Sequence, residues 1–125
     1  MSWSVSRSWQ APNQISTACS VGVELLVSTG LEIILLDEEH NQRWRRSLPF
    51  RVHAAAHASG KIGVLSGHGF HILRVSDGSQ IDEGRSTTGG FSDILPRPGG
   101  GWVLSCRQGQ LHVFNQDGRG LKRLE

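Results

Sequence analysis

An internal repeat is the feature that most constrains how this chain of 125 residues can fold. Apolar residues recur at a gap-free spacing of 39 residues, in the sets Leu26, Leu65, Leu104; Ile33, Ile72, Leu111; Leu36, Val75, Phe114; and Leu25, Val64, Val103. The pair Arg46-Ser47 keeps the same spacing to Arg7-Ser8 and to Arg85-Ser86. A period that apolar and polar positions share predicts a repeat architecture in which each unit folds alike.

Each repeat contains four short segments that read as β-strands. The two central ones are apolar and end at Gly, Asp or Ser, a pattern typical of strand–turn–strand units. A strand of smaller residues precedes them and a more polar strand follows. The predicted strands are 15–19, 23–28, 31–36 and 43–48; then 52–56, 62–66, 70–75 and 80–85; then 91–95, 101–106, 110–114 and 120–125. The alanines within residues 52–59 leave a short helix there as an alternative.

Four strands in each unit of about 40 residues predict an all-β, β-propeller-like fold. We expect about three four-stranded blades, 13–48, 52–86 and 91–125, and one extra N-terminal outer strand, 3–9. The small residues at 54–56 suit the crowded innermost strand of a blade, and the bulky, charged residues at 43–46 suit an outer strand. The whole chain is therefore predicted to be one propeller segment.

The turn that follows the third strand of the first repeat resembles a known family. The run Leu36-Asp37-Glu38-Glu39-His40-Asn41-Gln42-Arg43-Trp44 is similar to the blade turn of quinoprotein-type (PQQ-like) and WD40-like propellers, with looser versions at 75–81 and 114–121. The outer-strand Trp occurs in one full repeat, no Trp-Asp dipeptide ends a strand, and no quinone-binding residues can be mapped. The resemblance implies a propeller fold, but it does not imply a cofactor, and we expect none.

The number of strands also predicts an assembly. Residues 3–8, moved along the chain by three periods, fall on residues 120–125, so both ends carry an outermost strand. Closed propellers have about four to eight blades, so three blades leave apolar faces uncovered. We expect cover from a second copy, for example in a dimer that forms a six-bladed ring, or from the remaining blades of a longer chain. Exchange of residues 3–9 into a neighbouring copy is a further route.

Composition narrows the class of function. The net charge is +2, which is too mild to indicate a polyanionic partner. There is no apolar run of membrane-spanning length, no signal-peptide core, and only two distant cysteines, Cys19 and Cys106. These features predict a cytoplasmic, non-catalytic interaction scaffold with protein partners, no membrane and no cofactor.

Two histidines are the most reactive side chains predicted for the axial face of the propeller. His53 and His57 lie four residues apart, which is a metal-ligand spacing on a helix, whereas on a strand it places both on one face. We expect no metal site, and no catalytic residue, because the Gly63–Gly67 segment lacks the spacing of a nucleophile elbow. A small-ligand or substrate site at these histidines remains an alternative function.

A basic strand offers another alternative. Arg43, Arg45 and Arg46 surround Trp44, and basic residues interleaved with aromatic ones can grip single-stranded nucleic acid. The opposing interpretation is an outer strand whose arginines are solvated or paired with Glu38 and Glu39. With a net charge of +2 we favour the second interpretation and expect no nucleic-acid partner.

Overall fold

The computed structural model describes residues 8–66, 69–85, 90–114 and 120–124 of the chain. Within these ranges the chain forms β-strands and no helix, so the described part contains no helix that could cross a membrane. The strands are β1 (Thr17–Val21), β2 (Glu24–Ser28), β3 (Glu32–Leu36), β4 (Gln42–Ser47), β5 (Ala54–Ala58), β6 (Lys61–Leu65), β7 (Gly69–Arg74), β8 (Gln80–Arg85), β9 (Phe91–Pro96), β10 (Trp102–Cys106), β11 (Leu111–Phe114) and β12 (Gly120–Leu124).

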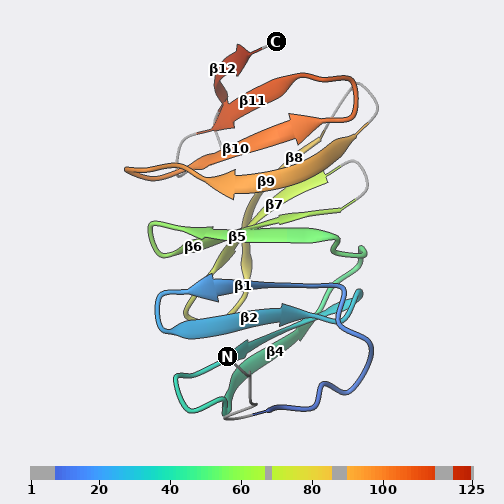
Figure 1. The fold of residues 1–125 in the computed structure, drawn as a ribbon, viewed down its shortest axis with the longest axis vertical. Helices are drawn as coiled ribbons and strands as arrows, with labels where there is room; N and C mark the ends of the chain where they lie inside the picture. Colours follow the sequence, from blue (N-terminus) through green and yellow to red (C-terminus); the bar gives the residue numbers. More distant parts are fainter. Residues whose placement is uncertain (1–7, 67–68, 86–89, 115–119, 125) are drawn as a thin grey trace, which may run out of the picture.

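The strands form three antiparallel four-stranded sheets, each in chain order. We call β1–β4 the first sheet, β5–β8 the second and β9–β12 the third. The sheets stack one above another, and β1, β5 and β9 lie side by side along one edge of the stack (Figure 1). The expected all-β fold of three four-stranded, blade-like units is therefore confirmed, with strands at the edge where a propeller would have its axis.

Most predicted strands agree with the structure within one residue, but β1 and β5 begin and end two residues later than predicted. The alternative of a helix over 52–59 is wrong, because β5 pairs with β6 along its whole length. Both residues of the β5–β6 connection have positive φ, 51° at Ser59 and 75° at Gly60, as a type I′ hairpin turn requires. This turn fixes the pairing of β5 and so prevents a helix.

Two apolar clusters hold the sheets together. Leu26, Ile33 and Leu35 of the first sheet pack against Ile62, Val64 and Leu73 of the second. Leu65, Phe70 and Ile72 on the other face of the second sheet pack against Ile94, Trp102 and Leu104 of the third. Each such side chain stabilises the fold by about 1.5–3 kcal/mol relative to exposure.

A hydrogen bond and a glycine tighten the contact between the second and third sheets. The Trp102 indole N–H donates to the Ala56 carbonyl at 3.2 Å. A Cβ at Gly63 would lie 2.9 Å from both Ile94 Cδ1 and Phe70 Cε2, so the absence of a side chain there lets the two sheets approach. The core therefore consists of two sheet-to-sheet interfaces.

Residues that are 39 positions apart do not point to the same face of the sheet in every repeat. The β2–β3 turn is closed by a hydrogen bond from Thr29 N–H to Glu32 O, whereas the β10–β11 turn, closed from Cys106 N–H to Gln110 O, is one residue longer. Side chains of a strand alternate between faces, so one residue is enough to change the face. Leu26 and Leu65 accordingly point to the following sheet, whereas Leu104 points back to the preceding one.

Two predicted elements reach beyond the described residues. The extra N-terminal outer strand, 3–9, lies outside them as far as residue 7, and Ser8 and Trp9 are not part of a strand. Residues 86 and 125, at the ends of the second and third predicted blades, also lie outside. The blade boundaries 13–48, 52–86 and 91–125 stay predictions.

Candidate functional site

The third sheet presents an apolar face that no other described sheet covers. Its residues alternate, with one set packed on the second sheet and the other pointing outward. Leu95 pairs with Val103, and Val103 pairs with Val113, which makes one apolar row across three strands. Leu95 is 61 % exposed and Leu111 is 39 % exposed, while the two valines are half-buried. We call these four residues the third-sheet outer face.

The opposite end of the stack is covered. On the first sheet the outward-pointing residues are Leu25, Val27, Ile34 and Leu36, which we call the first-sheet outer face. Val27 is 2 % exposed, and Ile34 and Leu36 are fully buried, although the described residues form no further sheet on this side. Trp9 packs against this face. The two ends of the stack therefore differ: one apolar face is open and the other carries a tryptophan.

The predicted basic strand does not form a single basic and aromatic surface. Arg43 pairs with Glu24 at 2.6 Å, and Arg45 makes two hydrogen bonds to Glu32, at 2.6 and 2.8 Å. Arg43 and Arg45 thus pair with Glu24 and Glu32, whereas the sequence interpretation left them solvated or paired with Glu38 and Glu39. The hydrogen bond from Arg45 holds the pKa of the Glu32 carboxyl below its ordinary value.

The other two residues of that strand point to the second sheet. The Trp44 indole N–H donates to the Val75 carbonyl at 2.7 Å, and the Arg46 guanidinium donates to the Asp77 carbonyl at 2.8 Å. A Cβ at Gly78 would meet the Trp44 ring at 2.6 Å, so this ring lies against the β7–β8 turn. Trp44 is therefore a contact between sheets, and its indole N–H is already engaged.

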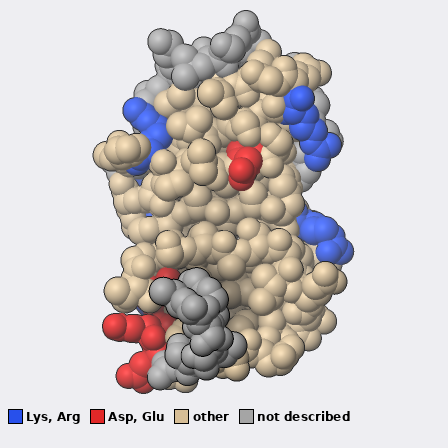
Figure 2. Space-filling view, viewed as in Figure 1, with Lys and Arg blue, Asp and Glu red and all other residues tan. Residues whose placement is uncertain are grey.

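The predicted histidines are separated by the structure. His57 lines a cavity of about 340 Å³ between the innermost strands, together with Cys19 and Ile94. His53 lies just before β5, exposed and not among the lining residues. Burial raises the pKa of the Cys19 thiol to about 11, so this thiol is neutral at physiological pH. Figure 2 shows that most of the surface over β1, β5 and β9 is uncharged, with an acidic side chain in the upper half of the view and with Lys and Arg at the edges.

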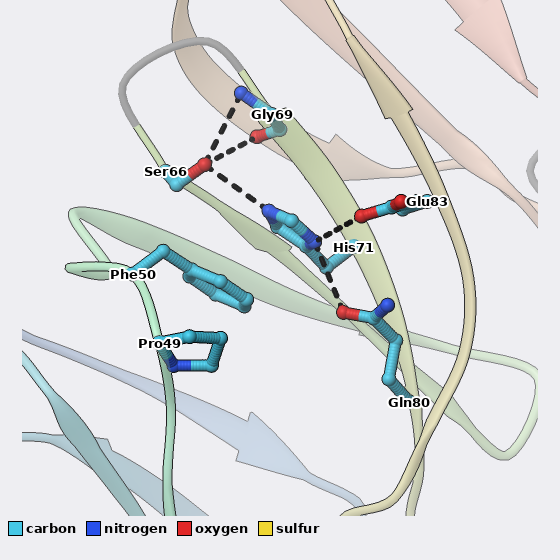
Figure 3. Close-up of a pocket in the computed structure, with 7 residues that line it drawn as sticks. All are labelled: Pro49, Phe50, Ser66, Gly69, His71, Gln80 and Glu83. Carbon is cyan, nitrogen blue, oxygen red and sulfur yellow. Dashed lines mark hydrogen bonds and ion pairs between the residues drawn. The ribbon is translucent and has the colours of Figure 1, made fainter.

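A second polar cluster, which the sequence did not predict, surrounds His71. A cavity of about 350 Å³ is lined by Pro49 and Phe50 from the β4–β5 connection and by residues of the second sheet (Figure 3). His71 Nε2 lies 3.1 Å from Ser66 Oγ, and its Nδ1 lies 3.1 Å from Gln80 Oε1. The Phe50 ring stacks on the imidazole at 3.7 Å. The only signal in the sequence is a histidine within an apolar strand.

The Ser66–His71 pair resembles an activated serine, but its surroundings do not fit acyl transfer. Gln80 Oε1 accepts a hydrogen bond, so His71 Nδ1 carries a proton, and Nδ1 also lies 3.7 Å from a Glu83 carboxylate oxygen. The Ser66 hydroxyl lies 3.1 Å from Nε2 and 3.4 Å from the Gly69 carbonyl, and either of them can accept its proton. An oxyanion needs preorganised N–H donors. Of the amides described next to the hydroxyl, Ser66 N–H donates to Gly69 O and Gly69 N–H donates to Ser66 Oγ. The stacking of Phe50 on His71 is a contact between the β4–β5 connection and the second sheet.

Metal binding has no matching cluster in the described residues. Groups of three or more His, Cys, Asp or Glu side chains that could hold an ion are absent from that part of the chain. The structural features that remain as candidates for recognition are the two end faces, the axial cavity at His57 and the cavity at His71.

These features define an all-β protein with a β-propeller-like fold. BamB from Moraxella catarrhalis, a β-propeller, has a similar structure, with a TM-score of 0.79, 17 % identity, and coverage of 98 % of this chain and 41 % of that chain. The computationally designed Ika8 protein is also similar, with a TM-score of 0.73, 7 % identity, and coverage of 86 % and 35 %. At these identities the likeness shows the fold alone.

This chain spans less than half of either structural neighbour. No protein-family model matches the sequence, and no curated protein matches it.

Proposed function

We propose that this chain is a non-catalytic interaction scaffold, built from PQQ-like or WD40-like propeller repeats, which self-assembles through its third-sheet outer face. The observation that carries the proposal is the exposure of Leu95, at 61 %, and of Leu111, at 39 %. In the first and second sheets the residues that point toward the next sheet are buried by that sheet. A contiguous apolar patch without cover is typical of an interaction site.

The partner we propose is a second copy of this chain, bound head to tail. Within the chain, the forward face of one sheet packs on the backward face of the next, and this contact occurs twice. The same contact between the third sheet of one copy and the first sheet of the other would extend the stack. Two such contacts close a dimeric ring of six sheets, within the range of about four to eight blades of closed propellers.

A second candidate is that the three sheets are part of a larger propeller, in which other blades cover the same face. The length of the structural neighbour favours this candidate, because the chain corresponds to 41 % of BamB. The cytoplasmic location stays a prediction made from the sequence.

The test is the mass of the particle in solution, measured by light scattering over a range of concentrations. We expect a species of twice the 13.7 kDa chain mass at high concentration. Leu95→Asp should shift it to the monomer, because a carboxylate in the contact would have to be desolvated. Val23→Asp is the matched control, since Val23 is 73 % exposed in the β1–β2 turn. A single monomeric species at every concentration would refute self-assembly and favour the larger propeller.

A further inference from the structure

Trp9 occupies the surface that the proposed partner needs. The first-sheet outer face is the backward face of the first sheet, so in a head-to-tail contact the third-sheet outer face of another copy must lie on it. In the isolated chain Trp9 packs there, against Val27, Ile34 and Leu36. A tryptophan and a β-sheet cannot cover the same three side chains together.

The cover that Trp9 provides is less complete than the cover that one sheet gives another. A cavity of about 240 Å³ remains between Trp9, Ile15 and the sheet residues Val27 and Leu36. Ile15, at the edge of this cavity, is 47 % exposed, and Trp9 itself is only half-buried. The residues that face each other between the first and second sheets, Ile33, Leu35, Ile62 and Val64, are fully buried, and so are Ile34 and Leu36 beneath Trp9. The two kinds of cover therefore differ in the cavity and in the exposed side chain of Ile15. An apolar sheet would fill this space better than a single indole ring.

We infer that Trp9 is an intramolecular stopper, which occupies the first-sheet outer face in the free chain and leaves it when a second copy binds. The inference rests on the proposed self-assembly and adds its regulation. It explains why the two ends of the stack differ, since the face that Trp9 covers is protected while the face with Leu95 stays open. Only chains in which Trp9 has left the first-sheet outer face can bind a second copy there. The apparent dissociation constant of the dimer is therefore the intrinsic one divided by the fraction of such chains.

The decisive variant is Trp9→Ala, compared with the wild-type chain and with Trp9→Phe by sedimentation equilibrium. Removal of the indole should lower the dimer dissociation constant by about tenfold or more, and Trp9→Phe, which keeps an aromatic ring, should lie between the two. The double variant Trp9→Ala with Leu95→Asp is the control and should be monomeric, because the partner face is then lost.

A spectroscopic measurement keeps the test independent of the stability of the alanine variant. The wild-type chain labelled with 5-fluorotryptophan has four tryptophans, and the resonance that Trp9→Phe removes belongs to Trp9. We expect this resonance to move toward a solvent-exposed position as the protein concentration rises and dimers form.

The outcomes separate the two proposals. A wild-type dimer whose affinity Trp9→Ala leaves unchanged would overturn the stopper while self-assembly stands. A weaker dimer would overturn it too, and would indicate that the N-terminal segment contributes to the contact by strand exchange. A wild-type chain that dimerises at high concentration, together with a Trp9→Ala variant that dimerises at lower concentration, would support both. If neither variant dimerises at any concentration, both proposals fail.

Discussion

Gly63 offers a sharp test of the interface between the second and third sheets. Its backbone φ lies outside the left-handed region, so alanine is conformationally allowed there, and the cost of Gly63→Ala is a cost of packing. The new Cβ would lie 2.9 Å from Ile94 Cδ1, 2.9 Å from Phe70 Cε2 and 3.0 Å from Trp102 Cε2. Because all three neighbours belong to the buried core, none can move freely into solvent.

The expected loss follows from overpacking. An extra methyl group in a well-packed core lowers the free energy of unfolding by about 1–3 kcal/mol. Urea unfolding followed by circular dichroism, at one fixed protein concentration, measures this loss without interference from association. The reasoning would be refuted by a Gly63→Ala variant that is as stable as the wild-type chain.

A double-mutant cycle identifies the clashing atom. Ile94→Val removes Cδ1, and alone it should cost about 0.5–1.5 kcal/mol. In the Gly63→Ala background the same change relieves one of the two closest contacts, so the double variant should lose less than the sum of the single losses, by about 0.5 kcal/mol or more. Strictly additive losses would show that Gly63 and Ile94 do not meet, and hence that the two sheets are not packed in this register.

Two further predictions concern the contact between the first and second sheets and the axial cavity. Trp44→Phe removes the N–H that donates to Val75 O, and should lower the free energy of unfolding by about 1–2 kcal/mol; an unchanged urea midpoint would contradict this role. Burial raises the pKa of the Cys19 thiol from 9.0 to about 11, so the folded state favours the neutral thiol. The contribution of this group to the free energy of unfolding is complete below pH 9 and is lost as the pH rises through 11. Alkylation of Cys19 by iodoacetamide, with Cys19→Ala as control, should accelerate up to about pH 11; a plateau near pH 9 would exclude the buried position.

The fold was largely predictable because apolar runs, turn residues and the repeat all point to the same strands. Leu26, Ile33 and their repeats mark the central strands, and those strands lie in the sheets at the expected places. What the pattern could not predict was how far the turns shift the register. Positive φ at Ser59 and at Gly60 makes the β5–β6 turn only two residues long, so that β5 ends two residues later and β6 begins one residue earlier than predicted. This depends on backbone angles that the residue types allow but do not determine.

The candidate sites were less predictable, for a physical reason. The pairing of Arg43 with Glu24 and of Arg45 with Glu32 joins residues on neighbouring strands or next-but-one strands, whereas the sequence favoured the nearby acidic residues of the turn. His71 meets Ser66 across a hairpin and Phe50 across a connection between sheets, so its partners depend on tertiary structure. Local sequence patterns report spacing along the chain and carry little information about such contacts.

The one-residue difference in the β10–β11 turn also determines the chemistry of the open face. In the constant 39-residue register Leu104 would point outward, as Leu26 and Leu65 do, and Val103 would point inward. The longer turn reverses them, so Leu104 joins the core beside Trp102 while Val103 lies outward between Leu95 and Val113. The bulkiest side chains of β10, Trp102 and Leu104, thus pack against the second sheet, and the outward row consists of branched residues of moderate size. The row consists of Leu and Val, which are also the residue types that pack between the described sheets, and this is the reason that we propose a β-sheet partner for this face.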